Sequence, residues 1–279
     1  MSAHVKSAFL SLIILAASAC GSAEQSSDGS SGTDSSAAVQ EGLDVMSSLA
    51  GRYAHYDVVA YEDNIFGMEM LSLVVTYGFT TLEIVDGELV SVDRFCHAEM
   101  PSNLDFENIV SDEFTRAIVP ESVVVSLIKE GDRWGYHRPA TPTPLGIDME
   151  DVDEPLPDAT DDPRITDADG DGKPGVTAGI ILPGGEPGEI YMIRKEVFAY
   201  TLYRQDNGHL VGVVEDGSEQ LVIGADPEWL NVPSRPEQFA DSAFSPIHLV
   251  PLAESEAVYD CDDLMRDVPT LFPSPEQFW

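Results

Sequence analysis

Basic residues are scarce in this 279-residue sequence, which has 14 Lys and Arg against 50 Asp and Glu and a formal net charge of −36. A chain this acidic repels phosphate groups, and no basic stripe or RNA-binding signature is present. Nucleic acid is therefore not expected as a partner. The acidic excess predicts solubility before any specific role, and divalent cations are its natural counter-ions.

Catalytic motifs are also missing. The sequence has no Gly-x-Ser-x-Gly elbow, no His-Glu-x-x-His motif, no Cys-x-x-Cys pair and no phosphate-binding glycine loop. Residues 134–138, Trp-Gly-Tyr-His-Arg, form the one aromatic and basic cluster; a packed segment is the favoured interpretation, and a sugar or carboxylate site is the alternative. Beyond residue 19, five histidines stand singly, and each is interpreted as a hydrogen-bonded or exposed residue rather than a ligand: His55, His97, His137, His209 and His248.

The N-terminus lacks an apolar run long enough to span a bilayer, which takes roughly 20 residues. The run from Ala8 to Ala16 is shorter; it follows Lys6 and precedes the small residues at 17–19. This layout is typical of a signal peptide over residues 1–19. The sequence therefore predicts an exported protein.

Ala17-Ser18-Ala19-Cys20 resembles the bacterial lipoprotein signal, in which a cysteine after a small residue receives lipid before cleavage. It departs from that pattern at Ala17, where Leu, Val or Ile is usual, so cleavage by the ordinary signal peptidase and a free or disulfide-bonded Cys20 stay open. The resemblance implies a stable membrane anchor on Cys20, since each buried methylene contributes about 0.8 kcal/mol. By the same resemblance, Gly21 favours the outer membrane, on a face that the sequence does not specify.

Residues 20–42 follow as a predicted flexible tether. Residues 21–40 read GSAEQSSDGSSGTDSSAAVQ, without an aromatic side chain and with almost no large apolar one. Such a segment cannot bury enough surface to offset its ordering entropy. Residues 43–279 remain for one domain with a sizeable core.

With Cys20 assigned to lipid, Cys96 and Cys261 are an even pair in an exported chain, and a disulfide between them is predicted. It would close a loop of about 165 residues, worth roughly 5 kcal/mol in the chain-entropy model. The alternative is a catalytic Cys96 beside His97. Neighbouring residues on a strand point to opposite faces, so that imidazole is badly placed to take the thiol proton.

Most of the periodic signal in residues 43–279 predicts strands, in a mainly β fold with a single antiparallel β-barrel or sandwich-like domain. The outline is similar to lipocalin-like barrels in shape only. Asp86-Gly87 predicts a hairpin, and Asn207-Gly208 and Asp216-Gly217 predict the turns of an antiparallel meander. Short helices are expected around residues 113–118 and 257–266. The expected strands are 51–61, 71–77, 80–85, 88–92, 189–193, 197–203, 209–214 and 220–223.

A long acidic insertion, residues 141–178, separates the two β regions and is rich in Pro and Gly. Long connections of this kind are usually functional or disordered. The acidic run at 148–154 alone indicates a solvated face. Asp167, Asp169 and Asp171 alternate before Gly172, which lets three carboxylates converge on one Ca²⁺, and the Lys173 carbonyl can add a ligand.

The run from Asp167 resembles the calcium loops of EF-hands, dockerins and thrombospondin type 3 repeats. It matches only the first half of an EF-hand loop, because Ala178 stands where the bidentate Glu is expected. A single structural calcium is therefore predicted rather than a regulatory EF-hand. Water, Asp161, Asp162 or the Thr177 hydroxyl would complete the ligand set. The alternative is an Asp/Gly-rich turn without an ion. Residues 162–177 also look like a loop of uncharacterised bacterial lipoproteins, which implies a cellular location and no activity.

Two functions stay open. The first is a noncatalytic, membrane-anchored envelope lipoprotein with a binding or assembly role, whose partner is an envelope protein or a glycan. The second is a cell-surface hydrolase or carbohydrate-active enzyme that uses loop carboxylates such as Asp148 or Glu150. The second requires a pair of carboxylates facing each other across a deep cleft at about 5–10 Å.

Overall fold

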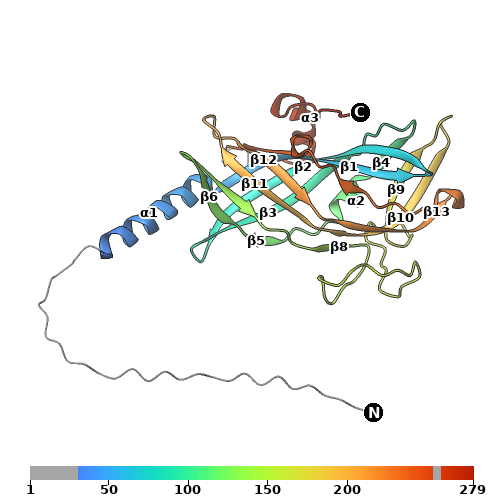
Figure 1. The fold of residues 1–279 in the computed structure, drawn as a ribbon, viewed down its shortest axis with the longest axis horizontal. Coiled ribbons are helices and arrows are strands. Elements are labelled where there is room, and N and C mark those ends of the chain that lie inside the picture. Colours follow the sequence, from blue (N-terminus) through green and yellow to red (C-terminus); the bar gives the residue numbers. More distant parts are fainter. Residues whose placement is uncertain (1–30, 254–258) are drawn as a thin grey trace, which may run out of the picture. The chain divides into compact units, whose positions relative to one another are not determined.

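Antiparallel strands make up most of the fold in the computed structural model, which describes residues 31–253 and 259–279 (Figure 1). They form a nearly closed, barrel-like sheet, which confirms the mainly β prediction. The strands are β1 (Gly51–Ile65), β2 (Met68–Val85), β3 (Glu88–Glu99), β4 (Glu107–Val110), β5 (Ser122–Val124), β6 (Ser126–Glu130), β7 (Arg133–Arg138), β8 (Thr143–Leu145), β9 (Val176–Ile181), β10 (Pro187–Glu196), β11 (Phe198–Arg204), β12 (Leu210–Asp216), β13 (Glu219–Asp226), β14 (Glu237–Gln238) and β15 (Pro246–Pro251).

The strands belong to two sheets. The larger sheet has the order β5-β3-β2-β1-β15-β12-β11-β7-β6, with β14 added on β1. The smaller has the order β13-β10-β9-β4, with β8 added on β10. The helices are α1 (Ser31–Leu49), α2 (Asp112–Arg116) and α3 (Cys261–Leu271), with 3-10 turns η1 (Glu228–Leu230) and η2 (Ser242–Phe244).

The hairpin predicted at Asp86-Gly87 is confirmed. Val85 of β2 pairs with Glu88 of β3 across the two turn residues. Both have positive φ, 52° at Asp86 and 87° at Gly87, as a type I′ turn requires. The turn fixes the register of two long strands, and in this register Ser91 and Asp93 of β3 are buried.

The predicted meander is wrong at Asp216-Gly217. The Asn207-Gly208 hairpin joins β11 to β12, but β13 does not turn back onto β12; it pairs with β10. Gly217 N donates to the Val197 carbonyl and Ser218 Oγ accepts from Val197 N, so the ladder continues past Asp216. Residues 189–204 and 210–226 thus form one long ribbon that passes from one sheet to the other. The Asp216 side chain accepts hydrogen bonds from the backbone N and the hydroxyl of Ser218. Such local bonding by Asp is typical of turns, which is why Asp216-Gly217 has the sequence pattern of one.

Both faces of β1 are buried, and its alternate side chains serve two different clusters. Tyr53, Val59 and Tyr61 belong to the core inside the barrel. The intervening residues, such as Tyr56, pack outside the barrel with Leu264 of α3. Because side chains alternate along a strand, the odd-numbered residues of β1 share the inward face.

Helix α3 and the segment after it cover the outer face of β1 and β2. Asp260 caps the helix in a capping box with Asp263, so α3 begins at Cys261, four residues after the start expected from the sequence. The Phe272 ring stacks on Tyr56 with their centroids 5.3 Å apart. The predicted short helix at 113–118 corresponds to α2.

Cys96 on β3 and Cys261 at the start of α3 form a disulfide, with an S–S distance of 2.02 Å and a Cα–Cα distance of 5.5 Å. This confirms the predicted pair. The bond joins positions 165 residues apart and holds α3 against the sheet. A catalytic role for the Cys96 thiol is excluded in this disulfide-bonded form.

Helix α1 differs from the predicted tether, because residues 31–42 of that segment are helical. Val45 and Leu49 are buried in the interior core, and the Tyr53 hydroxyl donates to the Leu49 carbonyl at 2.6 Å. From this buried end, the helix continues toward the N-terminus through polar residues. There the Gln40 side-chain amide donates to the Asp44 carboxylate. Tertiary packing of one apolar stripe has outweighed weak helix propensity.

The signal peptide at 1–19, Cys20 and the tether up to residue 30 lie outside the described residues, so they stay predictions. Among the helices in the described ranges, none is both long and apolar enough to cross a membrane.

Candidate functional site

The acidic loop between β8 and β9 is closed at its base by backbone pairing. Ile147 pairs with Ile165, and Asp167 pairs with Gly175. Gly175 has a φ of 83°, and a Cβ there would lie 2.2 Å from the carbonyl oxygen of Met192 on β10. Only glycine fits both conditions, so this residue lets residues 167–175 close as a small loop against the smaller sheet.

Three carboxylates converge on this small loop. One oxygen from each of Asp167, Asp169 and Asp171 lies within 4.8 Å of the others. Asp167 is the centre of the turn, because its Oδ1 accepts from Gly170 N at 2.8 Å and from Asp171 N at 3.1 Å. Its Oδ2 accepts from Gly172 N at 2.9 Å. Backbone amides thus hold three negative charges together that would otherwise repel one another.

Asp169 and Asp171 are both tied to Thr177 at the start of β9. Thr177 N donates to Oδ2 of Asp169 at 2.8 Å, and the Thr177 hydroxyl donates to Oδ2 of Asp171 at 2.6 Å. Oδ1 of Asp169 is buried and has no hydrogen-bond partner among the described residues. Burial, together with the nearby Asp171 charge, raises the pKa of Asp169. A buried carboxylate oxygen without a donor costs free energy, which a cation would remove.

The three predicted aspartates are thus brought together, and the cluster can hold a metal ion. The Lys173 amine contacts Glu189 of β10, which lowers the pKa of that carboxyl. Tyr191 also donates to Glu189, at 2.9 Å, so these contacts fasten the loop to the sheet. Asp162 instead binds Arg164 through both carboxylate oxygens, at 2.9 and 3.0 Å.

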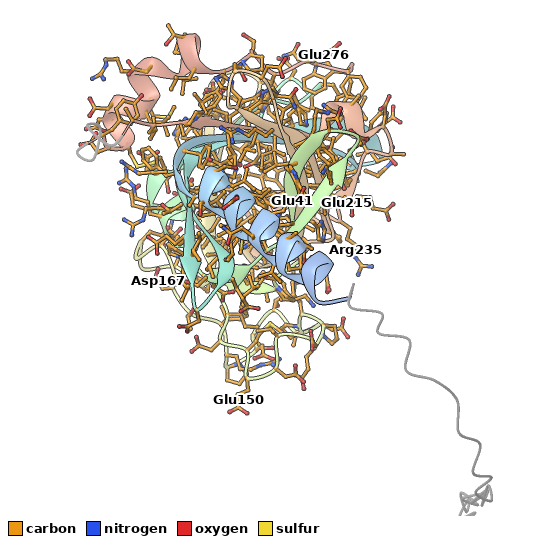
Figure 2. All side chains as sticks on the ribbon, turned by 90° about the vertical axis from the view of Figure 1, so that its left-hand side faces the viewer. Glu41, Glu150, Asp167, Glu215, Arg235 and Glu276 are labelled. Carbon is orange, nitrogen blue, oxygen red and sulfur yellow. A yellow bond between two sulfur atoms is a disulfide. The ribbon has the colours of Figure 1, made fainter. Side chains whose placement is uncertain are left out.

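The loop acids proposed for catalysis are peripheral. Asp148 and Glu150 are both exposed, and Figure 2 shows Glu150 at the outer edge of the acidic loop. The aromatic and basic cluster 134–138 forms β7, in which Tyr136 and Arg138 are buried. The cluster is therefore part of a packed strand, which agrees with the interpretation favoured from the sequence.

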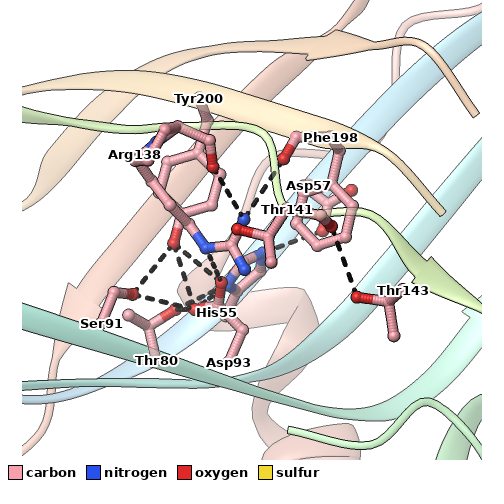
Figure 3. Close-up of polar contacts among 11 residues, drawn as sticks. His55, Asp57, Thr80, Ser91, Asp93, Arg138, Thr141, Thr143, Phe198 and Tyr200 are labelled. Carbon is pink, nitrogen blue, oxygen red and sulfur yellow. Dashed lines mark hydrogen bonds and ion pairs between the residues drawn. The ribbon is translucent and has the colours of Figure 1, made fainter. Parts of the chain in front are cut away.

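Sequence reasoning missed a buried polar cluster inside the barrel (Figure 3). Asp93 of β3 is its centre, 6% exposed. Tyr200 donates to both of its oxygens, at 3.1 and 2.9 Å, and Thr80 donates to Oδ1 at 2.7 Å. Nε of Arg138 forms an ion pair with Oδ2 at 3.2 Å, outside hydrogen-bond alignment. The guanidinium also lies over the ring of Phe198, 4.9 Å from its centroid.

His55 extends this cluster toward Asp57 on the same face of β1. Because Thr80 gives its one hydroxyl hydrogen to Asp93, its oxygen accepts from Nδ1–H of His55, 2.7 Å away. Nε2 of His55 lies 2.8 Å from Oδ2 of Asp57. Burial raises the pKa of Asp57. The i, i+2 spacing of His55 and Asp57 on a predicted strand was the one signal available.

Comparison with known protein families, with curated proteins and with solved structures found no match to this chain.

Proposed function

We propose that the chain is an exported lipoprotein, anchored through Cys20 to the outer membrane, with a noncatalytic binding or assembly role in the envelope and one structural calcium ion. The partner would be an envelope protein or a glycan. The observation that carries the proposal is the convergence of Asp167, Asp169 and Asp171, with Oδ1 of Asp169 left without a donor. The Cys96–Cys261 disulfide supports export, since such bonds persist in oxidising compartments.

Calcium suits this donor set better than a transition metal, because it takes six to eight hard oxygen ligands in flexible geometry. Asp167, Asp169 and Asp171 would hold the ion. The Lys173 carbonyl, the Thr177 hydroxyl and water would complete its coordination. The ion would supply positive charge among three carboxylates and fasten the acidic loop to β9. Calcium sites of extracellular modules bind weakly, with a Kd of about 10⁻⁴–10⁻³ M.

Chelation of calcium is expected to lower the melting temperature. An ion at about 100 times its Kd stabilises a folded protein by roughly 2.7 kcal/mol. For a domain of this size each kcal/mol corresponds to about 2–4 °C, so we expect a fall of roughly 5–10 °C in calorimetry. Asp169→Ala should abolish the response, whereas Glu150→Ala, in the same loop, should retain it. A melting curve that is unchanged by calcium would contradict the proposal.

The anchor is tested at the mature N-terminus. Mass spectrometry of the protein from bacterial membranes should find a chain that begins at Cys20 and carries acyl groups. Cys20→Ser should yield an unacylated protein that no longer sediments with membranes. An unmodified N-terminus in the native protein would show cleavage by the ordinary signal peptidase and remove the anchor from the proposal.

A further inference from the structure

A small cavity lies inside the barrel, beside the buried polar cluster. Its volume is about 100 Å³. A dry cavity of about 150 Å³ accommodates benzene, so this space suits a ligand of a few heavy atoms rather than a lipid. Apolar side chains from five strands form much of its wall: Val59, Val74, Phe95, Met192 and Phe198.

Acidic side chains also outnumber basic ones in the cavity wall. Asp57, Glu196 and Asp216 line it, together with a single guanidinium, that of Arg194. Glu196 binds Arg194 through both oxygens, at 2.6 and 3.2 Å, so these two charges offset each other. Another nitrogen of the guanidinium contacts Gln220. Asp57 is paired with His55, whose Nε2 lies 2.8 Å from Oδ2, so that Asp216 is the one acid of the three that forms no ion pair among the described residues.

Asp57 is the acceptor that faces the cavity. Only 13% of its side chain is exposed, and it belongs to the cavity wall. Oδ2 contacts His55, but Oδ1 accepts no hydrogen bond within the described part of the chain. Asp216 already accepts from the Ser218 hydroxyl at 2.6 Å. An open carboxylate oxygen at the edge of an apolar space favours a ligand with a positive group and a short hydrocarbon body.

We propose that this cavity binds a small primary ammonium compound, with its nitrogen at Oδ1 of Asp57 and its hydrocarbon chain against Val59 and Val74. A carboxylate ligand would be repelled by the acidic wall, in which Asp216 has no ion-pair partner among the described residues. A bare metal ion would find too few oxygen atoms to replace its hydration shell. A neutral alcohol would fill the space without gaining the charge interaction. The site shares no residue with the aspartate loop, so it goes beyond the calcium proposal.

The test uses propylammonium chloride as the probe and methyl-labelled methionine in the purified protein. Met100 and Met192 line the cavity, whereas Met68 is exposed and serves as an internal reference. NMR titration should give saturable shifts of the Met100 and Met192 methyl signals and none at Met68. Propan-1-ol, matched in size, should bind at least tenfold more weakly. Propionate should produce no response.

Asp57→Asn should weaken propylammonium binding at least tenfold while it preserves side-chain shape. Glu215→Gln is the matched control, because it removes an exposed carboxylate next to Asp216 on β12 (Figure 2). It should leave the affinity unchanged. If Asp57→Asn loses the dispersed methyl spectrum of the fold, Asp216→Asn serves instead, and a weakening of threefold or more is expected.

Three results would overturn the proposal: no saturable shift, equal affinity for propan-1-ol, or an unchanged affinity in the folded aspartate variant. The first would mean that the cavity holds water only. All titrations are made at saturating calcium and repeated with Asp169→Ala. The ammonium titration can therefore be interpreted even if the calcium site proves wrong. A failure of the ammonium proposal likewise leaves the calcium proposal unaffected.

Discussion

Replacing Cys96 and Cys261 together by alanine is expected to lower the free energy of unfolding by up to about 5 kcal/mol. The bond joins residues 165 positions apart, so its loss gives the unfolded chain much conformational freedom. It also releases the start of α3 from β3, on which the packing of Phe272 against Tyr56 depends. Urea denaturation monitored by tryptophan fluorescence would measure the difference.

Cys20→Ser in unlipidated protein is the control for this double replacement. It removes a cysteine but no disulfide, so it should leave the denaturation midpoint unchanged. Reduced wild-type protein should lose as much stability as the double variant. A loss below about 1 kcal/mol would mean that packing alone holds α3 on the sheet, because native disulfides of small domains contribute 2–5 kcal/mol.

Asp93→Ala is expected to destabilise the domain by about 3–5 kcal/mol. Arg138 is only 5% exposed, so its charge would remain buried without its carboxylate. Thr80 and Tyr200 would lose their acceptor as well. Removing one partner of a buried pair costs the desolvation of the other, which exceeds the net contribution of the pair itself.

The matched test is a double-mutant cycle. Asp93→Leu combined with Arg138→Met removes both charges and keeps an apolar filling, so it should cost less than the sum of the single variants by at least about 1 kcal/mol. Additive losses in chemical denaturation would show that the two side chains do not interact in the folded protein.

Local patterns in the sequence predicted the features that depend on neighbouring residues. Asp86-Gly87 specifies its hairpin because both residues tolerate positive φ. Asp167, Asp169 and Asp171 converge because the backbone amides of Gly170 and Gly172, in the same short turn, donate to the Asp167 carboxylate. The disulfide followed from residue counting in an exported chain rather than from any contact.

Features built from distant segments could not be predicted in the same way. Asp93, Arg138 and Tyr200 meet only because three strands of the larger sheet place them inside the barrel. Asp216-Gly217 has the composition of a turn, yet the ladder continues through it because Val197 and Ser218 supply the hydrogen bonds. Helix α1 forms because Leu49 is buried in the core, a contact that its own polar sequence does not reveal.

Calorimetric titration of calcium into the purified, chelator-treated protein is the most direct test of the aspartate loop. We expect one ion bound per chain in the wild type and in Glu150→Ala, and none in Asp169→Ala. Asp169 should decide the outcome because its buried Oδ1 has no hydrogen-bond partner among the described residues. The absence of saturable binding in the wild type, or binding that survives Asp169→Ala, would rule out the proposed calcium site.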